Sequence, residues 1–266
     1  MRYLLIVMFV CCLVIPARAS TETVREYVDR GDELRKKGDY NKAIEAYTQA
    51  LAAANPKDAN ETQAILMAYV HRGRVWERMH EFDKAIADCS KALELAPKDE
   101  ALYVIRGAAW MAKGDYDKAI ADASSAVALD PNYADAYNAR GEACRRKGLY
   151  DKAISDAAKA VSVEPKNATA YYNLAGIYAT CPERKYRDGK KAIEYALKAD
   201  ELREGKDFMV TDALAAAYAE SGDFAKARES QEKAIELAPD FIKPGLRVRL
   251  ELYKQGIPYH QPPVKK

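Results

Sequence analysis

The chain has 266 residues, and its 42 Lys and Arg nearly balance its 40 Asp and Glu, for a formal net charge of +2. This balance argues against a nucleic-acid binder, because such proteins neutralise phosphates with an excess of Lys and Arg. The length alone would suit one or two globular domains.

Residues 1–19 have the composition of a secretory signal peptide. Met1-Arg2 is a short positive start, Leu4–Ile15 is an apolar run of twelve residues, and Ala17-Arg18-Ala19 places small residues around a spacer. The run is shorter than the roughly 20 residues that span a bilayer. We expect cleavage after Ala19, export to the periplasm or the medium, and no stable membrane span in the mature chain. An uncleaved anchor is the alternative.

From Gly73 onward, one block recurs with a period of 34 residues. The positions that repeat are a glycine (Gly73, Gly107, Gly141), an aromatic residue (Phe82, Tyr116, Tyr150), Lys-Ala-Ile (from Lys84, Lys118, Lys152), an alanine (Ala92, Ala126, Ala160) and a proline (Pro97, Pro131, Pro165). A fixed period of this length is typical of a solenoid.

Each block predicts two helices. Gly114 and Gly148 suit the end of the first helix, where a residue at positive φ is needed. The closing prolines stop the second helix, since proline cannot continue one. His80 replaces this turn glycine in one block, so we expect that helix to end less cleanly.

The order of small residue, aromatic, Gly, aromatic, Ala, Ala and Pro resembles the tetratricopeptide repeat. The resemblance implies an all-α, right-handed superhelical solenoid of helix-turn-helix repeats. Looser copies flank the three regular ones, for example at Gly31–Ala50 and Leu214–Pro239. We place six repeats at residues 24–57, 66–99, 100–133, 134–167, 168–207 and 208–241, the fifth with an extended inter-helix turn at 181–189.

The chain after Pro239 leaves the period. Residues 242–256 predict a helix that caps the last repeat, and the proline-rich residues 257–266 predict a disordered tail. The extended turn (Ala179–Pro182 with Arg187–Gly189), together with the ending (Leu250–Tyr253 with Gly256–Tyr259), resembles a recurring bacterial variant of tetratricopeptide arrays. That variant is associated with uncharacterised interaction proteins.

A polar pair also recurs. Sixteen residues separate Arg72 from Asp88, and the same spacing recurs from Arg106 to Asp122 and from Arg140 to Asp156. We predict a ladder of structural ion pairs, with anion binding by the arginines as the alternative.

The first helices of successive tetratricopeptide repeats line a concave groove that holds extended protein segments. We predict a non-catalytic scaffold that binds a protein or peptide partner in this groove, in envelope assembly or secretion. Along this groove, an apolar stretch around Met111 lies between two basic stretches, around Arg74 and Arg145. This order suits a partner segment that has a hydrophobic anchor residue with acidic residues on either side. The candidate contact residues are Val70, Arg74, Arg78, Val104, Ala108, Met111, Asn138, Arg145 and Tyr172.

The sequence shows no catalytic motif, metal-ligand spacing or phosphate loop, so we expect no enzyme activity, metal or cofactor. Cys89 and Cys144 are predicted to be buried, and Cys181 in the extended turn to be more exposed. Two alternatives remain open at this point. One is a binder of small or polymeric envelope ligands such as peptidoglycan fragments, at Tyr172, Tyr178 and Tyr186; the other is an enzyme.

Overall fold

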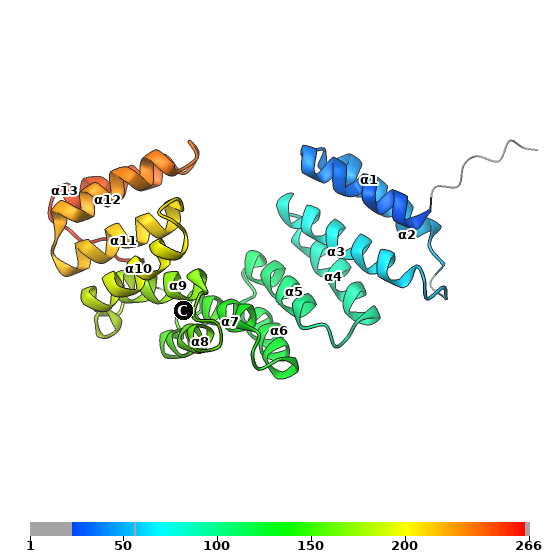
Figure 1. The fold of residues 1–266 in the computed structure, drawn as a ribbon, viewed down its shortest axis with the longest axis horizontal. Coiled ribbons are helices and arrows are strands. Elements are labelled where there is room, and N and C mark those ends of the chain that lie inside the picture. The colour runs from blue at the N-terminus through cyan, green and yellow to red at the C-terminus, as the bar shows by residue number, and fades with distance from the viewer. Residues whose placement is uncertain (1–22, 56, 264–266) are drawn as a thin grey trace, which may run out of the picture. The chain divides into compact units, whose positions relative to one another are not determined.

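The computed structural model describes residues 23–55 and 57–263, and these residues are helical throughout, without strands (Figure 1). The predicted signal segment, residues 1–19, lies outside them. Thirteen α-helices and one 3-10 turn follow in order: α1 (Val24–Lys37), α2 (Tyr40–Ala53), α3 (Thr62–Arg78), α4 (Phe82–Leu95), α5 (Glu100–Lys113), α6 (Tyr116–Leu129), α7 (Ala134–Arg146), α8 (Tyr150–Val163), α9 (Ala168–Thr180), η1 (Arg184–Tyr186), α10 (Gly189–Leu202), α11 (Phe208–Ser221), α12 (Phe224–Leu237) and α13 (Lys243–Lys254).

The chain divides into two compact units after Ala68. In the first unit, α1 packs against α2. Tyr47 of α2 is fully buried, and its hydroxyl donates a hydrogen bond to Asp32 Oδ1 at 2.7 Å. Its ring fills the space beside Gly31, where a Cβ would lie only 2.4 Å from the Tyr47 ring atom Cε1. The absence of a side chain at Gly31 therefore allows the Tyr47 ring to pack between the two helices.

In the second unit, the helices form stacked pairs: α5 with α6, α7 with α8, α9 with α10, and α11 with α12. First helices also contact one another, α5 with α7, α7 with α9, and α9 with α11. These contacts make the first helices one layer of a superhelical solenoid, and they line its inner, concave side. Helix α3 begins at Thr62, before the expected repeat boundary at residue 66.

Alanine makes the close helix contacts possible. Ala119, Ala153 and Ala192 lie in the first turn of the second helices and are at most 3% exposed, and Ala126, Ala160 and Ala199 later in those helices are fully buried. Each has only one side-chain carbon and loses no rotamer freedom on burial, so the helices approach closely at a small entropic cost. Helix α13 packs on α12, the second helix of the last pair.

The ends of the first helices follow one pattern. Gly114 and Gly148 have φ of 87° and 81°. His80 has φ of 61°, and the same bonds close its turn: His80 N–H donates to Glu77 O, and Glu81 N–H to Trp76 O. The expectation of a less clean end for α3 was therefore wrong. A non-glycine residue in this region instead adds strain of about 1 kcal/mol.

The Arg–Asp ladder is present. Arg106 donates from Nε and Nη2 to Asp122 Oδ2 and Oδ1 at 2.8 and 2.7 Å, and the pairs at Arg72–Asp88 and Arg140–Asp156 have the same two-bond geometry within 0.1 Å. Arg106 Nη1 also donates to Ser90 Oγ of the preceding repeat at 3.2 Å. The ladder thus joins the two helices of a repeat and ties neighbouring repeats together.

The inserted turn between α9 and α10 folds back on itself. Arg187 Nη1 donates to the carbonyl oxygens of Cys181 and Pro182 at 2.9 and 3.3 Å. This closure buries Cys181, which is 2% exposed and packs with Tyr150 and Tyr186. The prediction of an exposed Cys181 was wrong, whereas Cys89 and Cys144 are buried as expected.

Candidate interaction groove

Three of the hollows in the second unit share lining residues. The first, about 350 Å³, lies between α7 and α9 and is lined by Asn138, Ala139, Glu142, Arg145, Arg146, Thr169, Tyr172, Asn173, Gly176 and Gln261. These positions recur every three or four residues along each helix, so each set forms one helical face. The hollow is therefore built by the facing surfaces of two first helices.

The other two hollows continue the first. One, about 410 Å³, is lined by Glu77, Ala108, Met111, Ala112, Lys113, Gly114, Tyr116 and Arg146. The other, about 540 Å³, is lined by Tyr116, Arg145, Arg146, Tyr150, Tyr259, Gln261, Pro262 and Pro263. Because Arg146 lines all three, we treat them as one continuous surface and call it the inner groove.

Glu142 organises the charge in this groove. It accepts two hydrogen bonds from Arg145, both at 2.7 Å, and one from Arg146 at 2.8 Å. Burial by itself raises the pKa of Glu142, but the bonds and charges of both arginines outweigh it and lower that pKa below the ordinary 4.5. Two arginines around one carboxylate leave a net positive charge in the groove.

Asn138 presents a buried acceptor at the same place. Its Nδ2 donates to Asn167 Oδ1 at 3.0 Å, and that oxygen also accepts from Ala170 N–H at 3.0 Å. This arrangement fixes which atom of the Asn138 amide is the oxygen. Asn138 is 6% exposed, and its Oδ1 finds no donor among the residues that the structure describes. A buried acceptor without a partner is unfavourable, so a ligand N–H here would relieve that cost.

The predicted contact residues divide into two sets. Asn138, Arg145 and Tyr172 line one hollow, and Ala108 and Met111 line the next. The remaining four, Val70, Arg74, Arg78 and Val104, line none of the three hollows, although Arg74 and Arg78 are exposed on α3. The hollows also include Thr169, Asn173 and the tail residues, which were not predicted to line the groove. Helical spacing from Tyr172 points to Thr169 and Asn173, but nothing local to the tail indicates its position.

The tail is the main difference from the sequence-based expectation. We expected disorder from residue 257, yet residues 257–263 follow an extended path back to the first helices (Figure 1). His260 Nε2 lies 2.7 Å from Glu220 Oε2, and Gln261 N–H donates to the Thr180 carbonyl at 2.8 Å. Residues 264–266 of the predicted tail lie outside the described residues.

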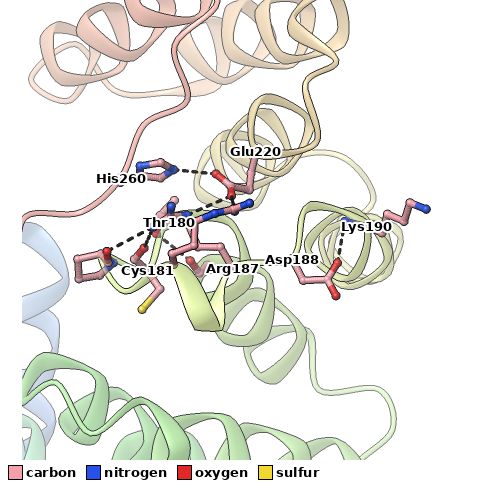
Figure 2. A network of polar contacts seen from close by, with 10 residues as sticks. Thr180, Cys181, Arg187, Asp188, Lys190, Glu220 and His260 are labelled. Carbon is pink, nitrogen blue, oxygen red and sulfur yellow. Dashed lines mark hydrogen bonds and ion pairs between the residues drawn. The ribbon is translucent and has the colours of Figure 1, made fainter.

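The inserted turn helps to hold this segment. Figure 2 shows Glu220 between His260 and Arg187, and Arg187 Nε donates to Glu220 Oε1 at 3.1 Å. Both side chains of this ion pair are at most 10% exposed. The inserted turn and the chain ending, which the sequence identified together, are therefore in contact.

The three tyrosines proposed for a small ligand do not form one pocket. Tyr172 lines the inner groove, Tyr178 stacks on Tyr195 with centroids 5.8 Å apart, and Tyr186 packs on Tyr150. The Tyr186 hydroxyl also donates to Asp151 Oδ2 at 2.7 Å. Two of the three rings are thus engaged within the protein.

The three described thiols are poorly suited to nucleophilic chemistry. Burial raises the pKa of Cys89 to about 12, and burial also raises the pKa of Cys144 and of Cys181. A thiol reacts as its thiolate, so these groups stay protonated near neutral pH. Within residues 23–55 and 57–263 no His, Cys, Asp and Glu side chains are grouped as metal ligands, and no helix is long and apolar enough to cross a bilayer.

Comparison with known proteins identifies the repeats. Sequence models of one family, described as tetratricopeptide repeat, match residues 27–56, 67–99, 106–162 and 212–241. The crystal structure of MamA is 30% identical, with 66% of this chain and 95% of the MamA chain covered and a TM-score of 0.52. The chain is a tetratricopeptide repeat protein.

Two further relatives bear on this tetratricopeptide repeat chain. A tetratricopeptide repeat protein from Parabacteroides merdae is 19% identical, over 88% of this chain and 87% of that one, with a TM-score of 0.64; this likeness concerns the fold alone. The human mitochondrial import receptor subunit TOM34 is 31% identical over 85 residues, which are 32% of this chain and 25% of TOM34. The match thus spans about a quarter of that relative. The repeats and these relatives support a protein-interaction scaffold.

Proposed function

We propose that this protein binds an extended segment of a partner protein in the inner groove, without catalysing a reaction. The observation that carries the proposal is the gathering of unlike binding groups on one surface. Ala108, Met111 and Ala112 offer apolar contacts, Arg145 and Arg146 offer positive charge, and Asn138 offers an acceptor for a backbone N–H. A segment with an apolar anchor and a nearby carboxylate fits this order.

We further propose that the protein acts in the cell envelope, as an adaptor in assembly or secretion. The support is the composition of residues 1–19, which resembles a cleavable signal peptide. The intact mass of the protein purified from a periplasmic or secreted fraction tests this point. A mass equal to residues 20–266 supports export with cleavage after Ala19, and a full-length mass in the cytoplasmic fraction contradicts it.

Site-specific photo-crosslinking in the native host tests the groove. A photoreactive amino acid replaces Ala112, which is exposed in the groove, or Ala128, which is exposed on the second helix α6 and is the matched control. We expect one partner to crosslink at position 112 but not at 128, and Arg145→Glu to abolish that product. Equal products at both positions, or products that persist with Arg145→Glu, would show that the partner binds elsewhere.

The crosslinked partner should also bind as an isolated segment. Peptides tiled across its sequence are titrated against the purified chain and against Met111→Glu, which places a charge in the apolar part of the groove. We expect one tile to bind, with affinity reduced at least about tenfold in the variant, since burial of an unpaired charge costs more than 1.4 kcal/mol. An unchanged affinity would remove Met111 from the binding surface.

A further inference from the structure

The segment after α13 contacts the first helices of three successive repeats. Beginning from the left-handed Gly256, it places the Tyr259 ring under Arg249, with 4.5 Å between the guanidinium carbon and the ring centroid. His260 then pairs with Glu220 of α11, and Gln261 bonds to Thr180 of α9 and to Arg145 of α7. This order of contacts runs across the inner side of the second unit.

The segment interacts with the protein as a bound peptide would. A backbone N–H of Gln261 pairs with a carbonyl of the α9 end, and its side-chain oxygen accepts from Arg145 Nη1 at 2.7 Å. Pro262 and Pro263 lie in the same hollow as Tyr116 and Tyr150. Proline-rich segments dock on aromatic surfaces with little loss of entropy, because their backbone is already extended.

The seat for residues 260–263 is nearly buried, whereas these residues themselves are more exposed; Tyr259 before them packs against the buried Tyr253. Arg187 and Glu220 are nearly buried and bonded to each other (Figure 2). By contrast, His260 is 32% exposed at its side chain, and Pro262 and Pro263 are exposed. The contacts of residues 260–261 are polar, and such contacts exchange readily with water or with a competing ligand. Residues 260–263 can therefore leave without unfolding the helices beneath them, while Tyr259 stays packed on the last repeat.

We propose that residues 257–263 are an internal ligand of the inner groove, which a partner segment must displace. The proposal rests on the proposed function, since it describes the regulation of the same groove. The two ligands compete for one atom: Arg145 Nη1 holds Gln261 Oε1, and it is also the donor that a partner carboxylate would take. The favoured partner segment is extended and contains proline, with a carboxylate or amide side chain in place of Gln261.

The first experiment uses the full chain and a peptide of its own sequence. The peptide covers residues 256–263 and carries a fluorescent label, and binding is measured by anisotropy. In the double variant His260→Ala with Gln261→Ala, the internal segment loses its side-chain bonds to Glu220 and Arg145 and competes less. Because a tethered ligand acts at an effective concentration near the millimolar range, we expect the peptide to bind this variant at least about tenfold more tightly than wild type.

Two controls make the outcome specific. Adding Arg145→Ala to the double variant should remove most of the gain, because the peptide then loses its partner for Gln261. A chain ending at Gly256, with helicity and melting temperature checked by circular dichroism, should bind the peptide as well as the double variant does. Binding to neither form, or equal binding to wild type and variant, would overturn the internal-ligand proposal.

The partner found by crosslinking gives the second measurement. Its segment should bind the double variant about tenfold to a hundredfold more tightly than wild type, the range that removal of a competing tethered ligand produces. An unchanged partner affinity would mean that the tail does not regulate binding. A failure of the proposed function gives a different result from a failure of the internal-ligand proposal. In that case the labelled tail peptide would still bind the double variant, but no partner would crosslink at position 112.

Discussion

Replacing Arg106 by leucine should destabilise the protein more than any exposed ion-pair substitution. Arg106 makes two bonds to Asp122 and one to Ser90, in the middle of the ladder. The side chain of Asp122 is only 8% exposed, whereas that of Arg106 is 23% exposed. Losing the arginine therefore leaves a nearly buried carboxylate unpaired, while losing the aspartate leaves an arginine that can still reach water.

The magnitudes follow from this asymmetry. We expect Arg106→Leu to lower the free energy of unfolding by about 3 kcal/mol, and Asp122→Leu by about 1.5 kcal/mol. The double variant leaves no unpaired charge, so we expect a loss of about 2 kcal/mol, chiefly from imperfect packing. The coupling energy of the pair is then about 2.5 kcal/mol, within the range measured for residues in contact.

Urea denaturation of the full chain at pH 7, followed by far-UV circular dichroism, measures all four proteins. The matched control is the exposed pair Lys91–Glu94, at 56% and 64% side-chain exposure, with the same leucine substitutions. Its coupling should stay below about 0.5 kcal/mol. Additive losses at Arg106 and Asp122 would refute a stabilising ladder. Unchanged stability in Arg106→Leu together with lost partner binding would instead favour anion binding by the arginines.

Three further predictions concern single positions. His80→Gly should raise the free energy of unfolding by about 1 kcal/mol, because it removes the strain of a left-handed histidine. Gly114→His should lower the free energy of unfolding by a similar amount. An unchanged free energy of unfolding in either variant would contradict this backbone strain. Gly189→Ala should lower the free energy of unfolding by about 2 kcal/mol, because the new Cβ would lie 2.6 Å from a backbone nitrogen of α11. The control is Gly245→Ala, where the new Cβ would meet open space and should not destabilise the protein. Equal melting temperatures of the two variants would contradict the clash at Gly189. Because arginine contacts lower the pKa of Glu142 despite burial, wild type should exceed Glu142→Gln in stability above about pH 4.5 and lose that advantage as the pH falls through the lower folded pKa. A difference that does not change with pH would show that another interaction is responsible.

The sequence by itself determined the repeating part of this protein. The period places each helix pair, because glycine, alanine and proline recur where the backbone must turn, approach closely or stop. It also placed the Arg–Asp ladder, since a spacing of sixteen residues that recurs in three equivalent repeats brings the same two positions together each time. A contact inside one repeat depends only on local geometry that the next repeat reproduces.

Only the tertiary structure decided the parts that do not repeat. Cys181 is buried because Arg187 closes the inserted turn over it, and no neighbouring repeat has such a turn to compare. The pairing of Gln261 with Arg145 joins residues 116 positions apart. It depends on how three helix pairs and α13 are arranged between them, and small rotations at each pair add up over that distance. The resemblance to tetratricopeptide repeats therefore predicted which helices line the groove, whereas the accumulated curvature decided which residues meet within it.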